Sequence, residues 1–120
     1  MRIYIAHNFE ARIELRKTVE LLESLGHTVT SRWIKDDSIF ERSMIVNSLY
    51  DISDIICSDV LIFFSDNYGD KPGKGKYVEL GYALAKGKRI FIVGQNNNSC
   101  IFYSLCEHVK TFEELEKFLA

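Results

Sequence analysis

The chain has 120 residues, of which 47% are hydrophobic and 27% are charged, proportions typical of a globular domain large enough to bury a core. Its net charge of −2, with basic residues scattered along the sequence, gives no electrostatic basis for binding a nucleic-acid polymer or an acidic membrane. We therefore expect residues 1–120 to form a single domain that binds neither.

The cysteines and the hydrophobic runs indicate a reducing, aqueous environment. Cys57, Cys100 and Cys106 are odd in number and lack metal-site spacing, so we predict a cytoplasmic protein without a bound metal. No apolar run reaches the roughly 18 residues of a membrane-spanning helix. The first residues lead directly into a strand and lack the layout of a signal peptide.

The first part of the chain alternates strand, helix and strand. We predict a buried strand at residues 3–6, followed by a helix with Asn8 as its N-cap. That helix ends at Leu25 and is closed by Gly26. A second strand is predicted at residues 27–33.

A second helix and a third strand occupy the middle of the chain. The helix is predicted at residues 40–57, and its apolar positions are Met44, Ile45, Leu49, Ile52, Ile55 and Ile56. The strand, at residues 60–64, is apolar on both faces, as expected of a central parallel strand covered by helices on both sides. A loop rich in glycine, aspartate and lysine follows it.

A third helix and a fourth strand come next. The helix ends at Gly87, and Tyr77, Leu80 and Leu84 share one face at the spacing of a core stripe. The strand is predicted at residues 89–94. The remaining predicted elements are a turn at 96–98, a helical turn at 101–105, a short strand at Val109 and a helix at 112–119 capped by Thr111.

Five strands alternating with helices predict an α/β fold. We expect a doubly wound, five-stranded parallel sheet between two helical layers, with the flavodoxin-like strand order 2-1-3-4-5. Ligands bind such sheets outside the carboxyl ends of the strands. The loops at this edge are predicted to begin at His7, Trp33, Ser65 and Gly94.

Several residues near this edge are able to carry chemistry. Glu79 lies in the opening turns of the third helix, either beside a cleft or as a solvated first-turn glutamate. Asp51 and Asp54 share a helix face, as a partly buried acid pair or as a solvated acidic face. Tyr4, near the end of the first strand, either directs its hydroxyl inward or is an ordinary core aromatic. Glycines and lysines at residues 73–76 form a weak anion-binding pattern.

Four segments together resemble the nucleoside 2-deoxyribosyltransferase superfamily, especially its small bacterial and phage-type members. They are residues 3–6, 26–33, 51–60 and 75–83. The most specific part is Glu-Leu-Gly-Tyr-Ala at 79–83, followed by Gly-Lys and a strand. The superfamily has the same doubly wound fold, so the resemblance and the periodicity agree.

The resemblance implies cleavage or transfer at the N-glycosidic bond of a (deoxy)nucleoside or nucleoside monophosphate. Glu79 matches the nucleophile, Asp51 matches the proton donor to the base, and Tyr4 matches the tyrosine that holds the nucleophile. Asp54 is a further candidate for substrate binding. This chemistry needs no metal or organic cofactor.

The resemblance also suggests how a small-molecule substrate is held. Asn8, Gly75 and Lys76 are candidates for binding a 5′-phosphate, and Phe9 or Trp33 is a candidate for stacking on the base. Trp33 equally suits the core. Members of the superfamily generally assemble as dimers or larger, so we expect a homo-oligomer.

One departure from the superfamily leaves alternatives open. The larger transferases have a C-terminal extension that contributes an asparagine to the neighbouring subunit, and the sequence up to Ala120 shows no counterpart. Hydrolysis of a nucleoside 5′-monophosphate is therefore an alternative to transfer between bases. A non-catalytic nucleotide-binding module and an NAD-cleaving domain are two further alternatives.

Overall fold

A five-stranded parallel sheet with the order β2-β1-β3-β4-β5 forms the centre of the computed structural model, which describes residues 1–95 and 100–120. The strands are β1 (Arg2–Ala6), β2 (Thr28–Val29), β3 (Val60–Phe64), β4 (Arg89–Val93) and β5 (Glu107–Val109). The predicted doubly wound sheet with flavodoxin-like order is therefore confirmed.

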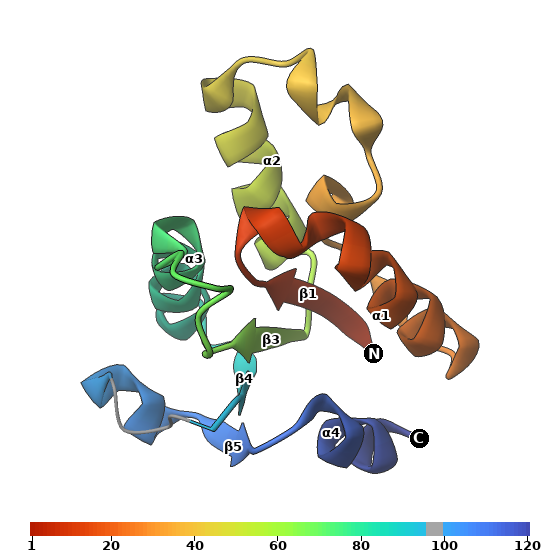
Figure 1. Cartoon of the computed structure of the whole chain (residues 1–120), viewed down its shortest axis with the longest axis vertical. Helices are drawn as coiled ribbons and strands as arrows, with labels where there is room; N and C mark the ends of the chain where they lie inside the picture. Colours follow the sequence, from red (N-terminus) through yellow and green to blue (C-terminus); the bar gives the residue numbers. More distant parts are fainter. Residues whose placement is uncertain (96–99) are drawn as a thin grey trace.

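Helices cover both faces of this sheet. They are α1 (Arg12–Ser24), α2 (Met44–Ile56), α3 (Lys74–Ala85) and α4 (Phe112–Leu119). In Figure 1, α2 and α3 lie together on one side of the strands, whereas α1 and α4 lie on the other. Because both faces are covered, β1, β3 and β4 are hydrophobic and buried along almost their whole length. Within the described residues, no helix combines the length and the hydrophobicity needed to cross a membrane.

The second strand and the first helix are shorter than predicted. The strand stops at Val29, and Arg32–Ile34 form a 3-10 helix because the Trp33 indole N–H donates to the Ile5 carbonyl and draws the chain over β1. Asn8 occupies an N-cap position, but its side chain caps nothing and instead donates to the Lys71 carbonyl. A 3-10 turn precedes α1, which therefore begins at Arg12.

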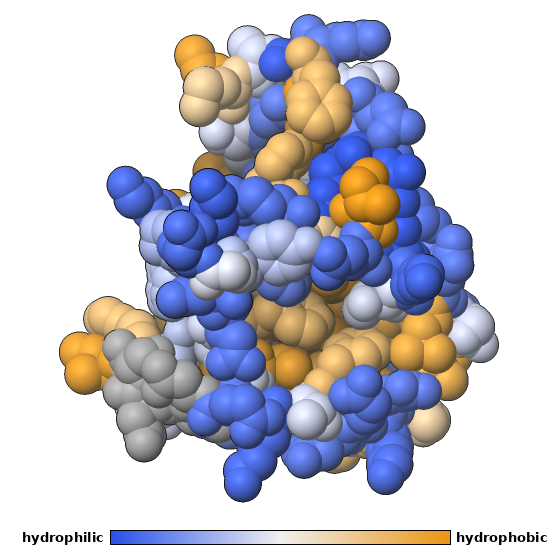
Figure 2. Space-filling model, viewed as in Figure 1, coloured by the Kyte–Doolittle hydropathy of each residue, from blue (hydrophilic) through white to orange (hydrophobic). Residues whose placement is uncertain are grey.

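The second helix begins later than predicted because Ser43 caps it. The Ser43 hydroxyl accepts a hydrogen bond from the Val46 N–H, and residues before it form the separate 3-10 helix Asp37–Phe40. Of the apolar positions predicted for this helix, only Ile55 is buried. The others are exposed: Met44, Ile45, Leu49, Ile52 and Ile56. Figure 2 shows hydrophobic atoms at the upper left, where α2 begins in Figure 1.

The buried face of α3 differs by one position from the predicted stripe. Lys76, Leu80 and Ala83 are buried, whereas Tyr77 is 36% exposed. Hydrophobic periodicity alone predicts Tyr77 in the core and Lys76 outside it, because lysine is not a hydrophobic residue. The asparagine turn predicted at 96–98 lies outside the described residues.

Candidate active site

A cavity of about 390 Å³ opens at the carboxyl ends of β1 and β3. Its walls come from the loop after β1, the 3-10 segments before α2, the middle of α2, and the start of α3 with the loop preceding it. Seven of the nine residues predicted for the site line it: Asn8, Phe9, Trp33, Asp51, Gly75, Lys76 and Glu79. The structure thus brings together residues from distant parts of the chain at the predicted edge of the sheet.

Tyr4 reaches this cavity through Glu79. The tyrosine is fully buried on β1, and its hydroxyl donates a hydrogen bond to Glu79 Oε2 on the second turn of α3. Burial, together with the nearby Glu79 and Asp51 carboxyls, raises the pKa of Tyr4 well above its ordinary value. The hydroxyl therefore remains a donor, and it fixes one oxygen of Glu79 while leaving the other available.

The two carboxyls in the cavity both ionise with difficulty. Burial raises the pKa of Glu79 to about 8, with a smaller contribution from Asp51, while the Tyr4 hydrogen bond acts in the opposite direction. Burial also raises the pKa of Asp51 to about 6, assisted by Asp54 and opposed by Arg32 and Arg42. Between these two values, the pair holds one proton.

Asp54 does not line the cavity. Its carboxylate is almost buried and faces Arg32, with a 2.9 Å ion pair to Nη2 and a 3.0 Å hydrogen bond from the backbone N–H. The Arg32 guanidinium in turn lies 4.0 Å from the centre of the Tyr50 ring. The structure therefore places Asp54 behind Asp51, in contact with protein groups instead of the cavity.

The loop between β3 and α3 is held against Asn8. Asn8 is buried, its Nδ2 donates to the Lys71 carbonyl at 3.0 Å, and its Oδ1 has no partner among the described residues. Gly73, at φ 64°, lies directly over this side chain, where an added Cβ would be 2.5 Å from Asn8 Oδ1. Only glycine fits this backbone conformation and this space, so Gly73 sets where α3 begins.

The start of α3 combines free N–H groups with charge. The first N–H groups of a helix have no intrahelical acceptor, and Gly75 leaves open space beside them. The ammonium of Lys76 is not directed to the cavity alone, because it donates to the Phe64 carbonyl at 2.8 Å and to the Asp66 carbonyl at 3.3 Å. Lys71 and Lys74, which are exposed, also line the cavity.

Aromatic side chains form another part of the cavity wall. Phe9 and Trp33 lie with their ring centres 6.2 Å apart and their planes inclined by 32°. Trp33 is only 5% exposed, yet its ring borders the cavity while its indole N–H is bound to β1. Trp33 is therefore a core residue that also borders the cavity, and its stacking on a base stays a prediction.

Several cavity residues were missed from the sequence. His7 stacks on Phe64 at 4.8 Å, and its Nδ1 accepts a 2.6 Å hydrogen bond from the Asn8 N–H. Burial and the Lys76 cation lower the pKa of His7 to about 4, so the ring is neutral. Its position directly after β1 was a usable signal, whereas Ile39, which directly precedes the helix predicted at residues 40–57, gave none.

Metal-ligating side chains do not gather in this part of the molecule. Across residues 1–95 and 100–120, no three His, Cys, Asp or Glu side chains are arranged to hold an ion.

Comparisons with known proteins show the fold of this chain. A 2-deoxyribosyltransferase from Bacillus psychrosaccharolyticus superimposes with a TM-score of 0.70 at 23% identity, covering 97% of this chain and 90% of that one. The CMP N-glycosidase BcmB of Clostridium botulinum gives 0.67 at 21% identity, covering 99% and 95%. A conserved protein from Enterococcus faecalis V583 gives 0.72 at 16%, covering 99% and 96%. No protein-family model and no curated protein sequence matches the chain.

These similarities define a class of architecture. The chain has the α/β fold that a deoxyribosyltransferase and a nucleotide N-glycosidase share, over nearly the full length of each. At 21% and 23% identity these similarities show the fold alone, so an argument about activity has to come from the residues that line the cavity.

Removing the Glu79 charge is expected to stabilise the fold in a pH-dependent way. The pKa of Glu79 lies near 4.5 when unfolded and at about 8 when folded, so the folded state binds more protons and loses stability as pH rises between these values. Glu79→Gln should therefore gain roughly 2–4 kcal/mol at pH 8 and little below pH 4.5. Urea unfolding at both pH values measures this, with the exposed Glu20→Gln as control. Equal gains at both pH values would contradict it.

Proposed function

We propose that this chain is an enzyme of the nucleoside 2-deoxyribosyltransferase superfamily that cleaves or transfers at the N-glycosidic bond of a (deoxy)nucleoside or nucleoside monophosphate. The observation that carries the proposal is the hydrogen bond from Tyr4 to Glu79 beside Asp51, in one cavity. The fold shared with a deoxyribosyltransferase and a CMP N-glycosidase supports it.

In the first step, Glu79 acts as the nucleophile. Its Oε2 is held by the Tyr4 hydroxyl, so Oε1 attacks the anomeric carbon C1′ of the sugar. The bond from C1′ to the base nitrogen breaks as the ester bond to Glu79 forms, through an oxocarbenium-like transition state. Asp51 donates its proton to the departing base, which leaves neutral.

In the second step, Asp51 reverses its role. As a carboxylate, it accepts a proton from water or from the N–H of a second base, and that nucleophile attacks C1′. The ester bond to Glu79 breaks and the carboxylate is regenerated. Two displacements at C1′ retain its configuration, and water gives hydrolysis whereas a base gives transfer.

Substrate recognition follows from the cavity walls. Phe9 and Trp33 present ring surface to the base, while Asn8 and Gly75 border the end where α3 begins. Asp54 acts through Asp51, because its own carboxylate is bound to Arg32.

A second candidate function is hydrolysis of a nucleoside 5′-monophosphate. Lys71 and Lys74 line the cavity beside the N-terminus of α3, where free N–H groups favour an anion. These exposed lysines supply the charge that the sequence suggested for Lys76, whose ammonium is bound to backbone carbonyls. This arrangement favours a phosphorylated substrate over a free nucleoside.

The activity itself is tested with a panel of nucleosides, nucleoside monophosphates and NAD, with free base measured by chromatography. We expect base release from at least one nucleoside or monophosphate, and a loss of at least about 10³-fold in kcat for Glu79→Ala. The exposed Glu20→Ala should keep full activity. A second base in the mixture separates transfer from hydrolysis. Nicotinamide release alone, binding without turnover, or turnover by Glu79→Ala would contradict the proposal.

The pH dependence should be bell-shaped. The mechanism needs one proton on the Asp51–Glu79 pair, so kcat/KM should fall below about pH 6, where both are protonated, and above about pH 8, where both are ionised. In Asp51→Asn, Glu79 is the only titrating acid of the pair. The kcat/KM of this variant should be much lower and should increase with pH in a single step as Glu79 ionises. An unchanged bell in Asp51→Asn would contradict these roles.

We further propose that the protein is a cytoplasmic homo-oligomer. The exposed apolar residues of α2, such as Leu49 at 59% exposure, provide hydrophobic surface for self-association. Sedimentation velocity should show a dimer or larger for the wild type and a shift towards monomer for Leu49→Glu. Ile13→Glu, which changes an equally exposed residue on α1, should leave the assembly intact. A monomeric wild type would contradict the proposal.

A further inference from the structure

We propose that Lys76 is a positioning residue whose ammonium fastens the first turn of α3 to the end of β3 and thereby places Glu79 against Tyr4. This inference rests on the proposed role of Glu79 as nucleophile. In this inference Lys76 holds the helix that carries the site in place and does not bind substrate.

Lys76 occupies a position that disfavours a cation in two ways. The side chain is only 2% exposed and shares the buried face of α3 with Leu80 and Ala83, although lysine is almost never fully buried without partners. It also lies in the first turn, where the helix dipole favours negative charge. Burial lowers the pKa of Lys76 accordingly. A lysine in such a place needs specific contacts that offset the cost of burying its charge.

Those contacts are made by backbone and rings. Nζ donates to the Phe64 carbonyl at 2.8 Å and to the Asp66 carbonyl at 3.3 Å. It also lies 5.4 Å from the centre of the Phe63 ring and 5.6 Å from that of Tyr77. Among the described residues, no carboxylate is within ion-pair distance of it. The ammonium is therefore committed to fixed groups of the fold.

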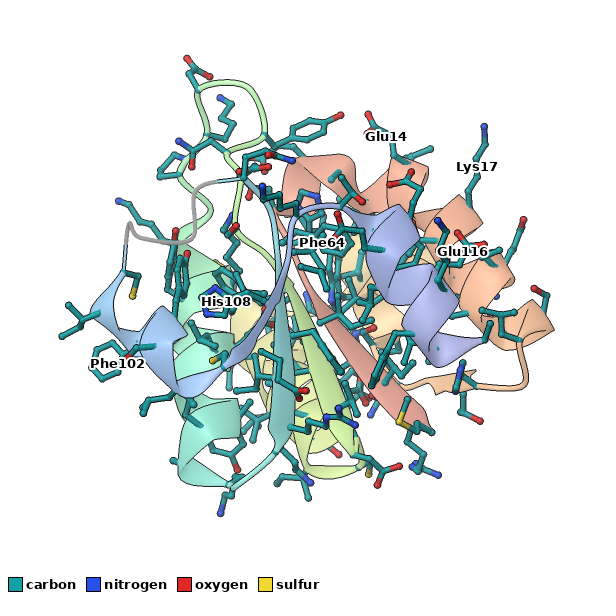
Figure 3. All side chains as sticks on the ribbon, turned by 90° about the horizontal axis from the view of Figure 1, so that it is seen from below. Glu14, Lys17, Phe64, Phe102, His108 and Glu116 are labelled. Carbon is teal, nitrogen blue, oxygen red and sulfur yellow. The ribbon has the colours of Figure 1, made fainter. Side chains whose placement is uncertain are left out.

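The two carbonyls belong to the point where the chain leaves the sheet. Phe64 is the last residue of β3, and Asp66 lies two residues into the loop that leads to α3. Figure 3 shows Phe64 at this edge of the sheet, below the green loop. Lys76 therefore joins both ends of the residue 65–73 segment, so the start of α3 is tied to β3 independently of that loop.

A closed path of contacts then connects the sheet to the nucleophile. β1 pairs with β3 up to Ala6 and Phe63, β3 is bound by Lys76, and Glu79 follows Lys76 by three residues, about one helical turn. Glu79 accepts from Tyr4, which returns the path to β1. Glu79 and Tyr4 are within hydrogen-bond distance only if α3 has the correct position along its axis relative to the strands. Lys76 holds the N-terminal end of the helix at this position by its hydrogen bonds to the end of β3, in addition to the contact of the preceding loop with Asn8.

The test replaces Lys76 with methionine, which retains length and apolar volume but removes all three donors. We expect Lys76→Met to lower kcat by about 10- to 100-fold with KM within about twofold, because small displacements of a reacting group cost rate. Lys76→Gln, which keeps a donor, should recover part of the loss. Lys86→Met makes the same change at the exposed lysine that directly follows α3 and should remain fully active. An unchanged kcat, or a loss confined to KM, would overturn the proposal.

A spectroscopic readout separates this inference from the proposed function. The ¹³C resonance of the Glu79 carboxyl should titrate near pH 8 in the wild type and at lower pH in Lys76→Met. A displaced carboxyl is better hydrated, and burial, the largest cause of the raised pKa, outweighs the opposing effect of the Tyr4 hydrogen bond. Lys86→Met should titrate as the wild type does. An unshifted Glu79 titration in Lys76→Met overturns the positioning role even if no substrate is ever cleaved. If Lys76→Met does not fold, the same two measurements are made on Lys76→Gln. A lower kcat and a lower Glu79 pKa than in the wild type are then expected.

Discussion

The partial burial of the Glu79 carboxyl is the constraint on which the rest of this structure depends. An ionised carboxylate in such a position is costly, and the cost appears as a pKa of about 8. The Tyr4 hydroxyl offsets part of it, since a hydrogen bond to a charged group contributes about 1.5–3 kcal/mol. That bond crosses from β1 to α3, so it exists only while the sheet and the helix keep their relative position.

Of the two acids in the cavity, Glu79 is weaker than Asp51, and Glu79 is the proposed nucleophile. Between pH 6 and pH 8 the shared proton resides mainly on Glu79, because its pKa of about 8 exceeds that of Asp51 at about 6. Positive charge developing at C1′ would favour ionised Glu79 and shift the proton towards Asp51 and the base. The reactive arrangement is thus favoured by the transition state more than by the free enzyme, which is how binding energy increases rate.

The fold was predictable because the spacing of hydrophobic residues along the chain directly indicates which segments are strands and which are helices. Strands that are hydrophobic on both faces, separated by helices, left one common topology, and the site edge followed from it. The orientation of side chains within helices was not predictable in the same way. The apolar residues of α2 could have faced the core, yet Met44 and Ile45 are exposed, while Asp54 and Ile55 are the buried residues of this helix. Likewise, a search for hydrophobic periodicity could not detect Lys76 as a core residue.

The position of Asp54 explains why Asp51 has intermediate acidity. Had Asp54 faced the cavity uncompensated, two adjacent carboxylates would have raised the pKa of Asp51 further. Arg32 instead binds Asp54 through its guanidinium and its backbone N–H, while Arg32 and Arg42 both pack on Tyr50 and lower the pKa of Asp51. The remaining shift, to about 6, comes first from burial. An acid of this strength suits the proposed double displacement, in which the same group would release a proton to the base and later recover one from the incoming nucleophile.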